Sequence, residues 1–395
     1  MKIAIIGGGA SGLVSAIVNK RKNNEVILIE KNDICGKKIL KTGNGRCNYF
    51  NEEFTINHYR SDDIDILKKI ITEENKEKIL KFFDSIGVVP KIKNGCYYPF
   101  SNKAETILNS LLIEVNKLDI NIICNANVLD INYNNKYIIK LENKEIIADK
   151  VVIATGSIAS TKEKTNFGYE ILKKFNHKII KPLPALVQLV GNETYFKKWA
   201  GIRSYVNLSI LESNKIIGTS KGEIMLTNYG VSGICVFDLS GRIKRRLNSN
   251  KEELLIDFLP CIDNFIEYIE KKDKQLKNRN IFELLEGTLN HKLIEILLEK
   301  SKIKKDSKLK EIDKKLLEKT FKKFKLSIID TKSYLEAQVC SGGIPLSEIN
   351  INTMESLKQK GLYILGELLD VDGDCGGYNL GFAWLSAILM GEDND

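Results

Sequence analysis

The sequence predicts an α/β fold in which a nucleotide-binding domain with a parallel sheet is interrupted by a β-rich and helical insert. Three observations predict it. Residues 1–30 follow a strand, glycine turn, helix, strand pattern; residues 121–155 and 182–260 contain short β-like runs; and residues 262–326 contain amphipathic, Lys-rich stretches before Gly-rich sequence returns near residue 337. At 395 residues, the chain exceeds one compact core and predicts two or three domains.

The first thirty residues are typical of one β-α-β unit. A short apolar run, KIAII, leads into glycines and then into apolar residues at helical spacing from Leu13, and EVILIE at 25–30 is typical of a second buried strand. Such a unit predicts two parallel strands that are joined by a right-handed crossover.

Gly7, Gly9 and Gly12 form a G-x-G-x-x-G pattern between the first strand and the helix. Glycines at this spacing permit a tight turn, close approach of the backbone to a pyrophosphate and close helix–strand packing, and the phosphates would meet the positive N-terminus of the helix. Glu30, at the end of the second strand, is placed to accept hydrogen bonds from ribose hydroxyls, and its charge would repel a 2′-phosphate. The pattern indicates a dinucleotide-binding site of the Rossmann type.

Two later segments indicate which dinucleotide binds. Residues 121–155 predict a parallel strand and a small antiparallel meander that returns to the sheet at VVIATG, where Ala154-Thr155-Gly156 supplies a second contact. Gly366-Glu367, after the strand GLYIL, supplies a third. Their order favours FAD over NAD. The chain has no second strand, G-x-G-x-x-G, helix unit, so NAD(P)H as reductant would dock transiently rather than in a domain of its own.

The predicted domain boundaries follow the changes of pattern. Residues 1–190 and 330–395 form a discontinuous FAD-binding domain, residues 191–261 an inserted β-barrel or sandwich, and residues 262–329 a helical subdomain. The β-like stretches of the insert are ALVQLV, YVNLSIL, GEIMLTN, ICVFDLS and ELLIDFL. The final helix is expected from about Leu380 to Met390.

Four stretches carry a family resemblance: GKKILKTGNGRCN at 36–48, PLPALVQL at 182–189, TMES at 353–356 and GLYILGELLDVDGDCGGYNLGFAW at 361–384. With them the chain resembles the HI0933-like flavoproteins, a family of NAD(P)/FAD-dependent oxidoreductases, over nearly its whole length. The resemblance implies a glutathione-reductase-type FAD domain, split in sequence, with an inserted β-barrel and a helical subdomain. Some members are similar to bile-acid reductases that saturate a ring carbon–carbon double bond conjugated to a ketone.

The resemblance also implies where the cofactor lies. Glu367 would sit at the ribityl chain, and the run Gly376 to Leu380 would pass beside the isoalloxazine, with the N-terminus of the following helix stabilising reduced flavin. Two departures concern the substrate side: Gly381 stands where the family usually has Gln, and Ser157 stands where it usually has a second Gly.

The expected contacts of non-covalently bound FAD combine these motifs. They are Gly7, Gly9, Ala10, Ser11, Gly12, Glu30, Lys31, Lys37, Thr42, Gly43, Asn44, Gly45, Arg46, Cys47, Val128, Ala154, Thr155, Gly156, Gly366, Glu367, Gly376, Gly377, Tyr378, Asn379 and Leu380.

The stretch GKKILKTGNGRCN has no apolar period, which indicates neither a core helix nor a strand. It follows the second strand, where the chain runs from the adenosine end toward the flavin. We expect Lys37 and Arg46 to face the pyrophosphate or the electron-rich edge of the flavin, and residues 42–48 to lie within contact distance of FAD, near its flavin end.

These motifs predict hydride transfer between flavin N5 and a small organic substrate, with NAD(P)H as electron donor. Reduction of a conjugated double bond also needs a proton donor, for which Arg46, Cys47 and Tyr378 are the candidates. Cys35 and Cys47 have eleven residues between them, not the four of disulfide reductases, so we do not expect a catalytic disulfide. The three histidines, His58, His177 and His291, are scattered, with no nearby acid or nucleophile in a recognisable arrangement, so we expect them to be surface or packing residues, and no metal constellation is present.

Composition and charge leave two alternatives open. The net charge of +9 is Lys-rich, and between Cys261 and Asp330 there are 18 Lys plus Arg against 13 Asp plus Glu of mixed order, so we do not expect nucleic acid as a partner. A flavin-dependent RNA-modifying enzyme nevertheless remains one alternative, and a non-enzymatic flavin-binding redox protein is the other. With no secretory signal and no apolar run near 20 residues, we expect a cytoplasmic protein with no membrane partner. The sequence sets no oligomeric state.

Overall fold

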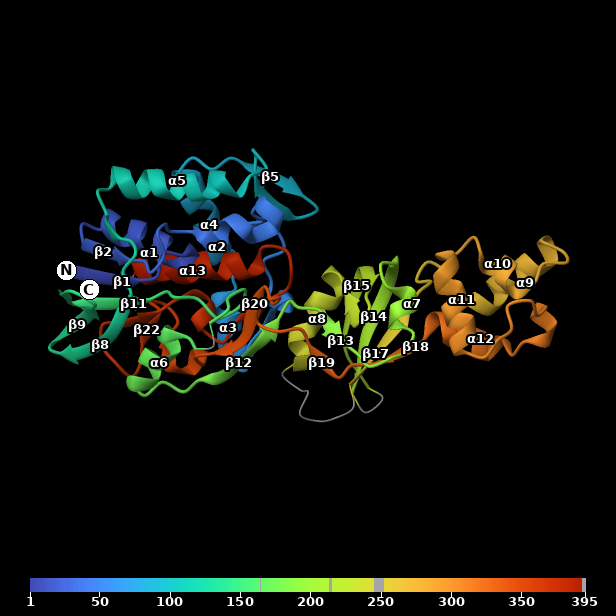
Figure 1. The fold of residues 1–395 in the computed structure, drawn as a ribbon. Coiled ribbons are helices and arrows are strands. Elements are labelled where there is room, and N and C mark those ends of the chain that lie inside the picture. Colours follow the sequence, from blue (N-terminus) through green and yellow to red (C-terminus); the bar gives the residue numbers. More distant parts are fainter. Residues whose placement is uncertain (164, 213–214, 245–251, 393–395) are drawn as a thin grey trace. The chain divides into compact units, whose positions relative to one another are not determined.

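The computed structural model describes residues 1–163, 165–212, 215–244 and 252–392. The chain divides into two compact units (Figure 1). Unit 1 comprises Met1–Pro182 and Val339–Asp395, and unit 2 comprises Leu183–Gln338. The chain thus leaves unit 1 once and returns to it. The division of the insert at residues 261 and 262 stays a prediction.

The central sheet of unit 1 has seven strands, in the order β21-β22-β23-β11-β1-β2-β7. Five neighbouring strands run parallel, from β7 to β23, and β21 and β22 add an antiparallel edge. The strands are β1 Lys2–Ile6, β2 Glu25–Ile29, β7 Asn121–Ile123, β11 Lys150–Ile153, β21 Ile349–Asn350, β22 Glu355–Ser356 and β23 Leu362–Ile364. The Rossmann-type α/β fold that the sequence predicts is therefore confirmed.

Helix α1 (Ala10–Arg21) connects β1 to β2, as the first motif predicts. The C-terminal helix α13 (Tyr378–Glu392) packs along α1, and Gly391 permits the close approach, because a Cβ there would lie 2.4 Å from Val18 Cγ2. The two helices join segments far apart in the sequence. The other helices of unit 1 are α2 Lys37–Lys41, α3 Ile64–Ile70, α4 Glu73–Ser85, α5 Ala104–Lys117 and α6 Phe167–Lys174, with 3-10 turns at Thr42–Gly45, Ile56–His58, Leu346–Glu348 and Gly366–Leu368.

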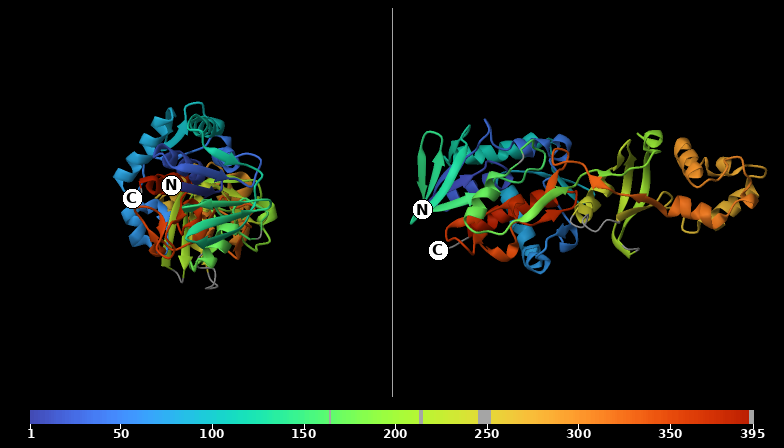
Figure 2. Two further views of the ribbon diagram at one scale, coloured as in Figure 1. Left: turned by 90° about the vertical axis from the view of Figure 1, so that its left-hand side faces the viewer. Right: turned by 60° about the horizontal axis from the view of Figure 1, so that its bottom comes forward.

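Small sheets complete unit 1. The predicted meander is an antiparallel sheet of three strands, which Figure 2 shows in green beside the N-terminus. A second sheet has the order β3-β6-β5, and two pairs join β4 to β24 and β12 to β20. Their bounds are β3 Phe50–Asn51, β4 Tyr59–Arg60, β5 Pro90–Lys93, β6 Cys96–Pro99, β8 Val128–Asn134, β9 Lys136–Leu141, β10 Glu145–Ala148, β12 Ile180–Ala185, β20 Val339–Gly343 and β24 Asp372–Gly373.

The stretch GKKILKTGNGRCN is partly helical. Its first turn, Lys37–Lys41, forms α2, where the sequence indicated no regular element. The remainder is irregular, because Gly43, Asn44 and Cys47 have left-handed backbone, with φ of 54°, 55° and 55°. Five residues are too few to show an apolar period, which explains the missed helix.

Unit 2 contains an antiparallel sheet of seven strands in the order β18-β17-β14-β15-β16-β13-β19. Its bounds are β13 Leu189–Val190, β14 Arg203–Glu212, β15 Lys215–Leu226, β16 Gly230–Ser232, β17 Glu252–Asp257, β18 Phe324–Ser327 and β19 Asp330–Thr331.

One expected strand of the insert is a helix. ICVFDLS begins α8 (Ile234–Lys244), which lies against β15. The buried residues Cys235, Val236, Leu239 and Ile243 recur at helical spacing, so the apolar period extends beyond the seven residues that suggested alternation. The prediction of a strand there is wrong because the window was too short.

The helices that follow gather together, in orange in Figures 1 and 2. Their buried side chains belong to the same apolar cluster as those of the sheet, from Leu208 on β14 to Phe321 on α12. Unit 2 thus has one continuous core. These helices are α9 Phe265–Gln275, α10 Ile281–Leu285, α11 His291–Lys300 and α12 Lys314–Lys322, with a 3-10 turn at Leu309–Glu311; the short helix α7, Phe196–Trp199, precedes β14. Among the described residues of the chain, none of the helices is both long and apolar enough to traverse a membrane.

Candidate functional site

The glycine motifs of unit 1 meet at the carboxyl edge of the parallel sheet. Gly7 follows β1 and its N–H donates to Ile29 O at the end of β2, while the N–H of Ala154 donates to Ile6 O. The N–H of Leu365, after β23, donates in turn to Ile153 O. In a sheet of this kind ligands bind outside the carboxyl ends of the strands. Motifs separated by up to 360 residues therefore form one site.

Two glycines of the first motif are required by the fold. Gly7 has a φ of 104°, and a Cβ there would lie 2.5 Å from Ala154 O. A Cβ on Gly12 would lie 1.8 Å from the carbonyl oxygen of Gly7, so only glycine lets α1 approach the strand. Gly9 differs, because no protein atom of the described residues lies within 4 Å of its Cβ position and its φ of −81° suits any residue. Protein packing does not require a glycine there.

The N-terminus of α1 is available to an anion. Its N-cap is Gly9, which offers no side chain, and the first turn contains no acidic residue. The free N–H groups and the positive end of the helix dipole both favour a phosphate. Space at Gly9 and an uncapped helix end together form a cradle of the size and charge that a pyrophosphate needs.

Glu30 lies beside this cradle and is buried, with 7% of the residue exposed. Its Oε2 accepts from the N–H of Gly8 at 2.7 Å, and Oε1 accepts from the N–H of Asn32 at 2.8 Å. Ala126 N–H donates to the Glu30 backbone oxygen, which brings the start of β8 and Val128 close to this position. The glycine loop thus holds the carboxylate in place.

Glu367 is the centre of a second polar cluster at the same sheet edge. Its Oε1 accepts from Ser157 Oγ at 2.6 Å and from the N–H of Cys340 at 3.0 Å, and its Oε2 pairs with Lys38 Nζ at 2.9 Å. The Glu367 side chain is 19% exposed. Burial, together with the Glu367 charge, raises the pKa of the Cys340 thiol to about 12, so this thiol stays protonated at neutral pH.

The C-terminal glycine run is held against residues 48–51. Asn51 Nδ2 donates to Gly376 O at 2.9 Å. Gly377 has a φ of 96°, and a Cβ there would lie 2.7 Å from Phe50 O and 2.8 Å from Asn48 Oδ1. The structure therefore brings the end of the GKKILKTGNGRCN stretch against the glycine run. That these residues contact FAD stays a prediction.

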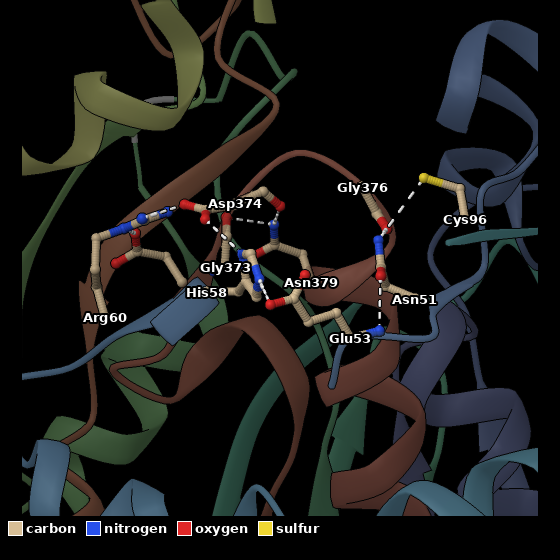
Figure 3. A network of polar contacts seen from close by, with 10 residues as sticks. Asn51, Glu53, His58, Arg60, Cys96, Gly373, Asp374, Gly376 and Asn379 are labelled. Atoms are coloured by element: carbon tan, nitrogen blue, oxygen red, sulfur yellow. Dashed lines mark hydrogen bonds and ion pairs between the residues drawn. The ribbon is translucent and has the colours of Figure 1, made fainter. Parts of the chain in front are cut away.

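A buried charge network continues from the glycine run (Figure 3). Arg60 Nε donates to Asp372 Oδ2 at 2.7 Å, and Arg60 Nη1 pairs with Asp374 Oδ1. His58 Nδ1 lies 3.0 Å from Asp374 Oδ2, and the His58 ring is stacked on Tyr378, with centroids 4.4 Å apart and planes at 13°. Burial opposes the charge of Arg60, but the two aspartates outweigh burial and raise its pKa.

The three predicted proton donors lie in different surroundings. Arg46 is exposed, and its guanidinium lies over the Tyr98 ring at 5.7 Å. Cys47 is 0% exposed, and burial raises the pKa of its thiol to about 11. Tyr378 is buried at the start of α13, with its ring against His58 and edge-on to Tyr59. Of the three, Tyr378 is the one whose ring is stacked on His58 of the charge network.

The predicted lysine contacts pair elsewhere. Lys37 Nζ pairs with Asp33 and Lys31 Nζ with Glu163, in both cases between exposed side chains. Lys38, which the sequence did not single out, is the lysine that reaches Glu367. Adjacent lysines of one helical turn point in different directions, and no local signal in the sequence distinguishes them.

The remaining predicted contacts lie on the same loops. Gly366 sits against α1 and α13, since a Cβ there would lie 3.0 Å from Ser11 Oγ and 3.6 Å from Ala383 Cβ. The side-chain oxygen of Asn166 caps α6 and its amide donates to Gly156 O at 2.7 Å, which orders the loop of Thr155. The others lie within elements or loops given above: Ala10, Thr42, Gly43, Asn44, Gly45, Asn379 and Leu380.

Gly381 lies against the ring of Phe50, with 3.1 Å between a Cβ position there and Phe50 Cδ2. The side chain that the family usually has at this position would need Phe50 to move. Phe50 itself is fully buried and packs on Phe54 and Tyr97. In this chain an aromatic cluster fills the space beside the first turn of α13.

Each of the three histidines has an acidic partner in the structure, although the sequence shows no recognisable arrangement. His58 pairs with Asp374, His177 Nδ1 lies 2.7 Å from Glu348 Oε2, and His291 Nδ1 lies 2.8 Å from Glu286 Oε1. The first two pairs join residues 316 and 171 positions apart, so only the tertiary fold reveals them. Among the described residues no group of three or more potential ligands could hold a metal ion.

Cys35 and Cys47 lie in separate environments and both are free thiols. Burial and the neighbouring Cys124 raise the pKa of Cys35 to about 12. A Cβ on Gly8 would lie 2.5 Å from Cys35 Sγ, which places this thiol under the glycine loop. Cys47 instead packs among the apolar residues of the unit 1 core.

The site's residues fit FAD. The Gly9 cradle suits the pyrophosphate, and Glu30 stands at the strand end where a ribose would lie. Within the described part of unit 1, the buried side-chain polar atoms that lack a hydrogen-bond partner are Asn48 Oδ1, His58 Nε2 and Arg60 Nη2. All three belong to residues 48–60, next to the glycine run. Buried polar groups are ordinarily hydrogen-bonded, so three such atoms in one segment fit a place where a polar ligand would supply the partners.

This sheet order, glycine loop and helix end define a protein of the Rossmann-type dinucleotide-binding class. The family model described as "HI0933-like protein Rossmann domain" matches residues 1–393. The chain belongs to this family, which confirms the resemblance that its motifs indicate.

Curated relatives of similar length extend over nearly the whole chain. The 3-dehydro-bile acid delta(4,6)-reductase of Clostridium scindens is 35% identical and is aligned over 99% of this chain and 98% of its own length. The ribosomal RNA dihydrouridine synthase of Haemophilus influenzae is 27% identical over 97% of this chain and 96% of its own. The protein of the same name from Escherichia coli is 26% identical over 98% and 96%.

Proposed function

We propose that this chain is an FAD-dependent oxidoreductase that saturates a carbon–carbon double bond conjugated to a carbonyl group, with NAD(P)H as electron donor. A small organic enone of the steroid or bile-acid kind is the proposed substrate. The observation that carries the flavin assignment is the Gly9 cradle: open space at a glycine that packing does not require, at an uncapped helix N-terminus.

The names of the relatives support the reaction class. A 3-dehydro-bile acid with delta(4,6) unsaturation has ring double bonds conjugated to a ketone. Uridine has a ring double bond conjugated to a carbonyl, and dihydrouridine is its saturated product. Both names thus describe hydrogenation of a polarised double bond, in which a hydride adds to one carbon and a proton to the other. The 35% identity over almost the whole chain favours the steroid-like substrate for this protein.

The chain's own residues would position the cofactor and exclude water. The N-terminus of α1 would hold the pyrophosphate, Glu30 the ribose, and Glu367 the ribityl hydroxyls, with Lys38 fixing the Glu367 carboxylate. The first turn of α13 and the glycine run would lie along the flavin. FAD, when bound, supplies the hydride; the protein must supply the proton and hold the substrate carbonyl.

Three measurements in sequence test this proposal. The purified protein is first examined for flavin absorbance, with FAD added if none is bound. Anaerobic stopped-flow mixing with NADH and with NADPH then measures bleaching of the flavin. Finally, the bleached protein is mixed with 4-androstene-3,17-dione, and reoxidation and product are followed. We expect bound FAD, bleaching by one nucleotide and reoxidation by the enone. Protein that takes up no FAD contradicts the flavin assignment, and absence of bleaching by either nucleotide contradicts the electron donor.

An RNA substrate is the second candidate. The excess of 18 Lys plus Arg over 13 Asp plus Glu between Cys261 and Asp330 and the two dihydrouridine synthase relatives favour it. Filter binding of ribosomal RNA fragments at low and moderate salt tests it, since phosphate contacts by lysines make the affinity fall steeply as salt rises. Absence of binding at low salt removes this candidate. Bound flavin that no donor reduces would instead point to the non-enzymatic redox protein.

A further inference from the structure

His58 lies beside the glycine run, where we place the flavin, and its imidazole is a side chain that can donate a proton. Its Nδ1 faces Asp374 Oδ2 at 3.0 Å, its ring is stacked on Tyr378, and 24% of the side chain is exposed. Asp374 makes the shorter of the two carboxylate contacts, at 3.0 Å against 3.4 Å from Nε2 to Glu53, so we assign the fixed proton to Nδ1 and leave Nε2 as the atom that gains or gives a proton. Figure 3 shows His58 between Asp374 and Glu53.

The backbone fixes His58 against the glycine run. β4 pairs with β24, so that Arg60 lies opposite Asp372 and Tyr59 opposite Gly373. In continuation of that pairing, the N–H of Asp374 donates to His58 O at 2.9 Å. Asn379 closes the loop from the other side, with its Oδ1 2.8 Å from the N–H of Gly373. His58 is therefore at a fixed distance from the residues that we place beside the flavin.

The two aspartates of the network share one guanidinium, because Arg60 pairs with both Asp372 and Asp374. The Asp372 side chain is 0% exposed and that of Arg60 is 10% exposed, so this part of the network is shielded from solvent. The imidazole of His58 faces a carboxylate with each of its nitrogens, Asp374 at 3.0 Å and Glu53 at 3.4 Å.

A second observation, independent of the ion pairs with the aspartates, is that buried nitrogens of His58 and Arg60 lack hydrogen-bond partners within the described part of the chain. His58 Nε2 and Arg60 Nη2 are buried and have no hydrogen-bond partner among the described residues, although the Glu53 carboxylate lies 3.4 Å from Nε2. Glu53 is 67% exposed and connects this nitrogen to solvent. Arg60 Nη2, a buried N–H donor without a hydrogen-bond partner in the described residues, and His58 Nε2, whose contact with Glu53 is a longer ion pair, suit a ligand that carries a carbonyl oxygen or a developing negative charge.

The donors that the sequence suggested are less suitable. Cys47 is enclosed by the protein, with its pKa raised to about 11 by burial. Arg46 carries a guanidinium, which does not release its proton in proteins. Tyr378 has its ring between His58 and Tyr59 and orients the imidazole. An imidazole, in contrast, is the side chain that most often transfers protons in general acid–base catalysis.

We propose that His58 is the catalytic acid that protonates the substrate carbon next to the carbonyl group, an inference that rests on the proposed reductase function. When hydride reaches the far carbon of the double bond, a C–H bond forms there and the π electrons move toward the carbonyl oxygen. The Nε2–H bond of the imidazolium then breaks, and the proton forms the second C–H bond. The neutral imidazole regains a proton from water along Glu53. The double bond is reduced by two electrons, which the flavin supplies.

Arg60 and Asp374 are positioning residues in this proposal. Asp374 fixes the Nδ1 proton and stabilises the imidazolium, and Arg60 holds Asp374 while its Nη2 is buried without a hydrogen-bond partner among the residues that the structure describes. A guanidinium N–H there would donate to the carbonyl oxygen on which negative charge develops.

Two acceptors for the reduced flavin, one that receives a proton at carbon and one that does not, separate proton delivery from electron transfer. His58→Phe keeps a ring to stack on Tyr378 but removes both nitrogens, and His58→Gln keeps a polar N–H without a proton to release. His291→Gln is the matched control, because His291 also pairs with a carboxylate, Glu286, but on a helix of unit 2. Each protein is bleached with dithionite, then mixed with 4-androstene-3,17-dione or with ferricyanide, which takes electrons without receiving a proton at carbon.

We expect reoxidation by the enone to slow about a hundredfold or more in both His58 variants, as for loss of a general acid, and reoxidation by ferricyanide to remain unchanged. His291→Gln should match the unaltered protein with both acceptors. Equal enone rates in His58→Phe and the unaltered protein would overturn the inference while leaving the reductase function in place. An unaltered protein that no enone reoxidises contradicts the reductase function itself and the inference with it.

A binding measurement gives a readout besides activity. The anion of 4-chlorophenol mimics the oxygen-centred negative charge of the reaction, and its binding to the oxidised protein changes the flavin absorbance. A charged hydrogen bond from His58 predicts that His58→Phe binds the phenolate about tenfold more weakly than the unaltered protein. Equal affinities, in a variant whose ferricyanide rate shows an intact flavin site, would place His58 away from the substrate.

Discussion

Arg60 and Asp372 form an ion pair in the interior of unit 1. Arg60 Nε lies 2.7 Å from Asp372 Oδ2, the Asp372 side chain is 0% exposed, and that of Arg60 is 10% exposed. The two residues face each other across the β4–β24 pair, which ties residues 59–60 to the loop before the glycine run. The pair therefore holds together two segments of the candidate site that are more than 300 residues apart in the sequence.

Substitution of Asp372 by Asn should destabilise the protein strongly. Removing one charge of a buried pair leaves the other uncompensated, which costs about 3–5 kcal/mol. Chemical unfolding, followed by circular dichroism, measures the change. The control is Asp65→Asn, which breaks the exposed pair of Lys68 and Asp65 and should leave stability nearly unchanged, because solvent screens this pair. Equal effects of the two substitutions would show that the Arg60–Asp372 pair is hydrated rather than buried.

Some of this site follows from the sequence because its signals are local. Gly7, Gly9 and Gly12 lie within one turn between two buried strands, so their spacing alone specifies the loop. Glu30 follows from the end of the second strand. The glycine run at 376–377 needed the family resemblance, since a short glycine turn is not specific by itself.

Other parts of the site depend on tertiary contacts. His58 and Asp374 are 316 positions apart, and no periodicity relates them. Lys38 rather than Lys37 reaches Glu367 because of the direction of one helical turn, which the sequence does not determine. ICVFDLS alternates like a strand over seven residues, and only the buried Ile243 beyond it reveals the helical period. Local pattern thus predicts nucleotide-binding loops better than it predicts polar networks.

Two alanine substitutions distinguish a glycine that leaves room for FAD from a glycine that the fold requires. Gly9→Ala should leave the unfolding temperature of the cofactor-free protein nearly unchanged, since the new methyl group meets no described protein atom, but should weaken FAD binding about tenfold or more by occupying the phosphate cradle. Gly12→Ala should instead unfold the protein at lower temperature, because its Cβ would lie 1.8 Å from Gly7 O. Thermal unfolding and flavin fluorescence titration measure the two effects. Unchanged FAD affinity in Gly9→Ala would show that the pyrophosphate does not bind at Gly9.

His177 and Glu348 predict a loss of stability on acidification. Burial lowers the pKa of His177 below its ordinary 6.5, although the Glu348 carboxylate opposes this effect. Burial raises the pKa of Glu348, but hydrogen bonds from Lys358 and His177 outweigh burial and lower it below 4.5. In both cases the unfolded chain binds more protons, so stability is complete above the ordinary value and decreases as pH falls through the folded one. The free energy of unfolding should therefore decrease below pH 6.5, and again below pH 4.5.

His177→Gln provides the test of this pH dependence. His177 Nε2 lies 2.8 Å from Ser356 Oγ and Nδ1 lies 2.7 Å from Glu348, and a Gln side chain can both accept and donate hydrogen bonds without titrating. Urea unfolding at a series of pH values should show a smaller loss of stability just below pH 6.5 in the variant than in the unaltered protein. The same loss in both would assign the acid sensitivity to other groups.

Thiol reactivity should separate the exposed cysteine from the buried ones. Cys261 is exposed, whereas burial raises the pKa of Cys47 to about 11 and those of Cys235 and Cys340 to about 12. A rise of about two units lowers the thiolate fraction about a hundredfold, and burial adds a steric barrier. Brief treatment with iodoacetamide, followed by peptide mass spectrometry, should therefore modify Cys261 first. Cys47 modified as fast as Cys261 would show that residues 42–48 open in solution, which would contradict the packing of this segment against the glycine run.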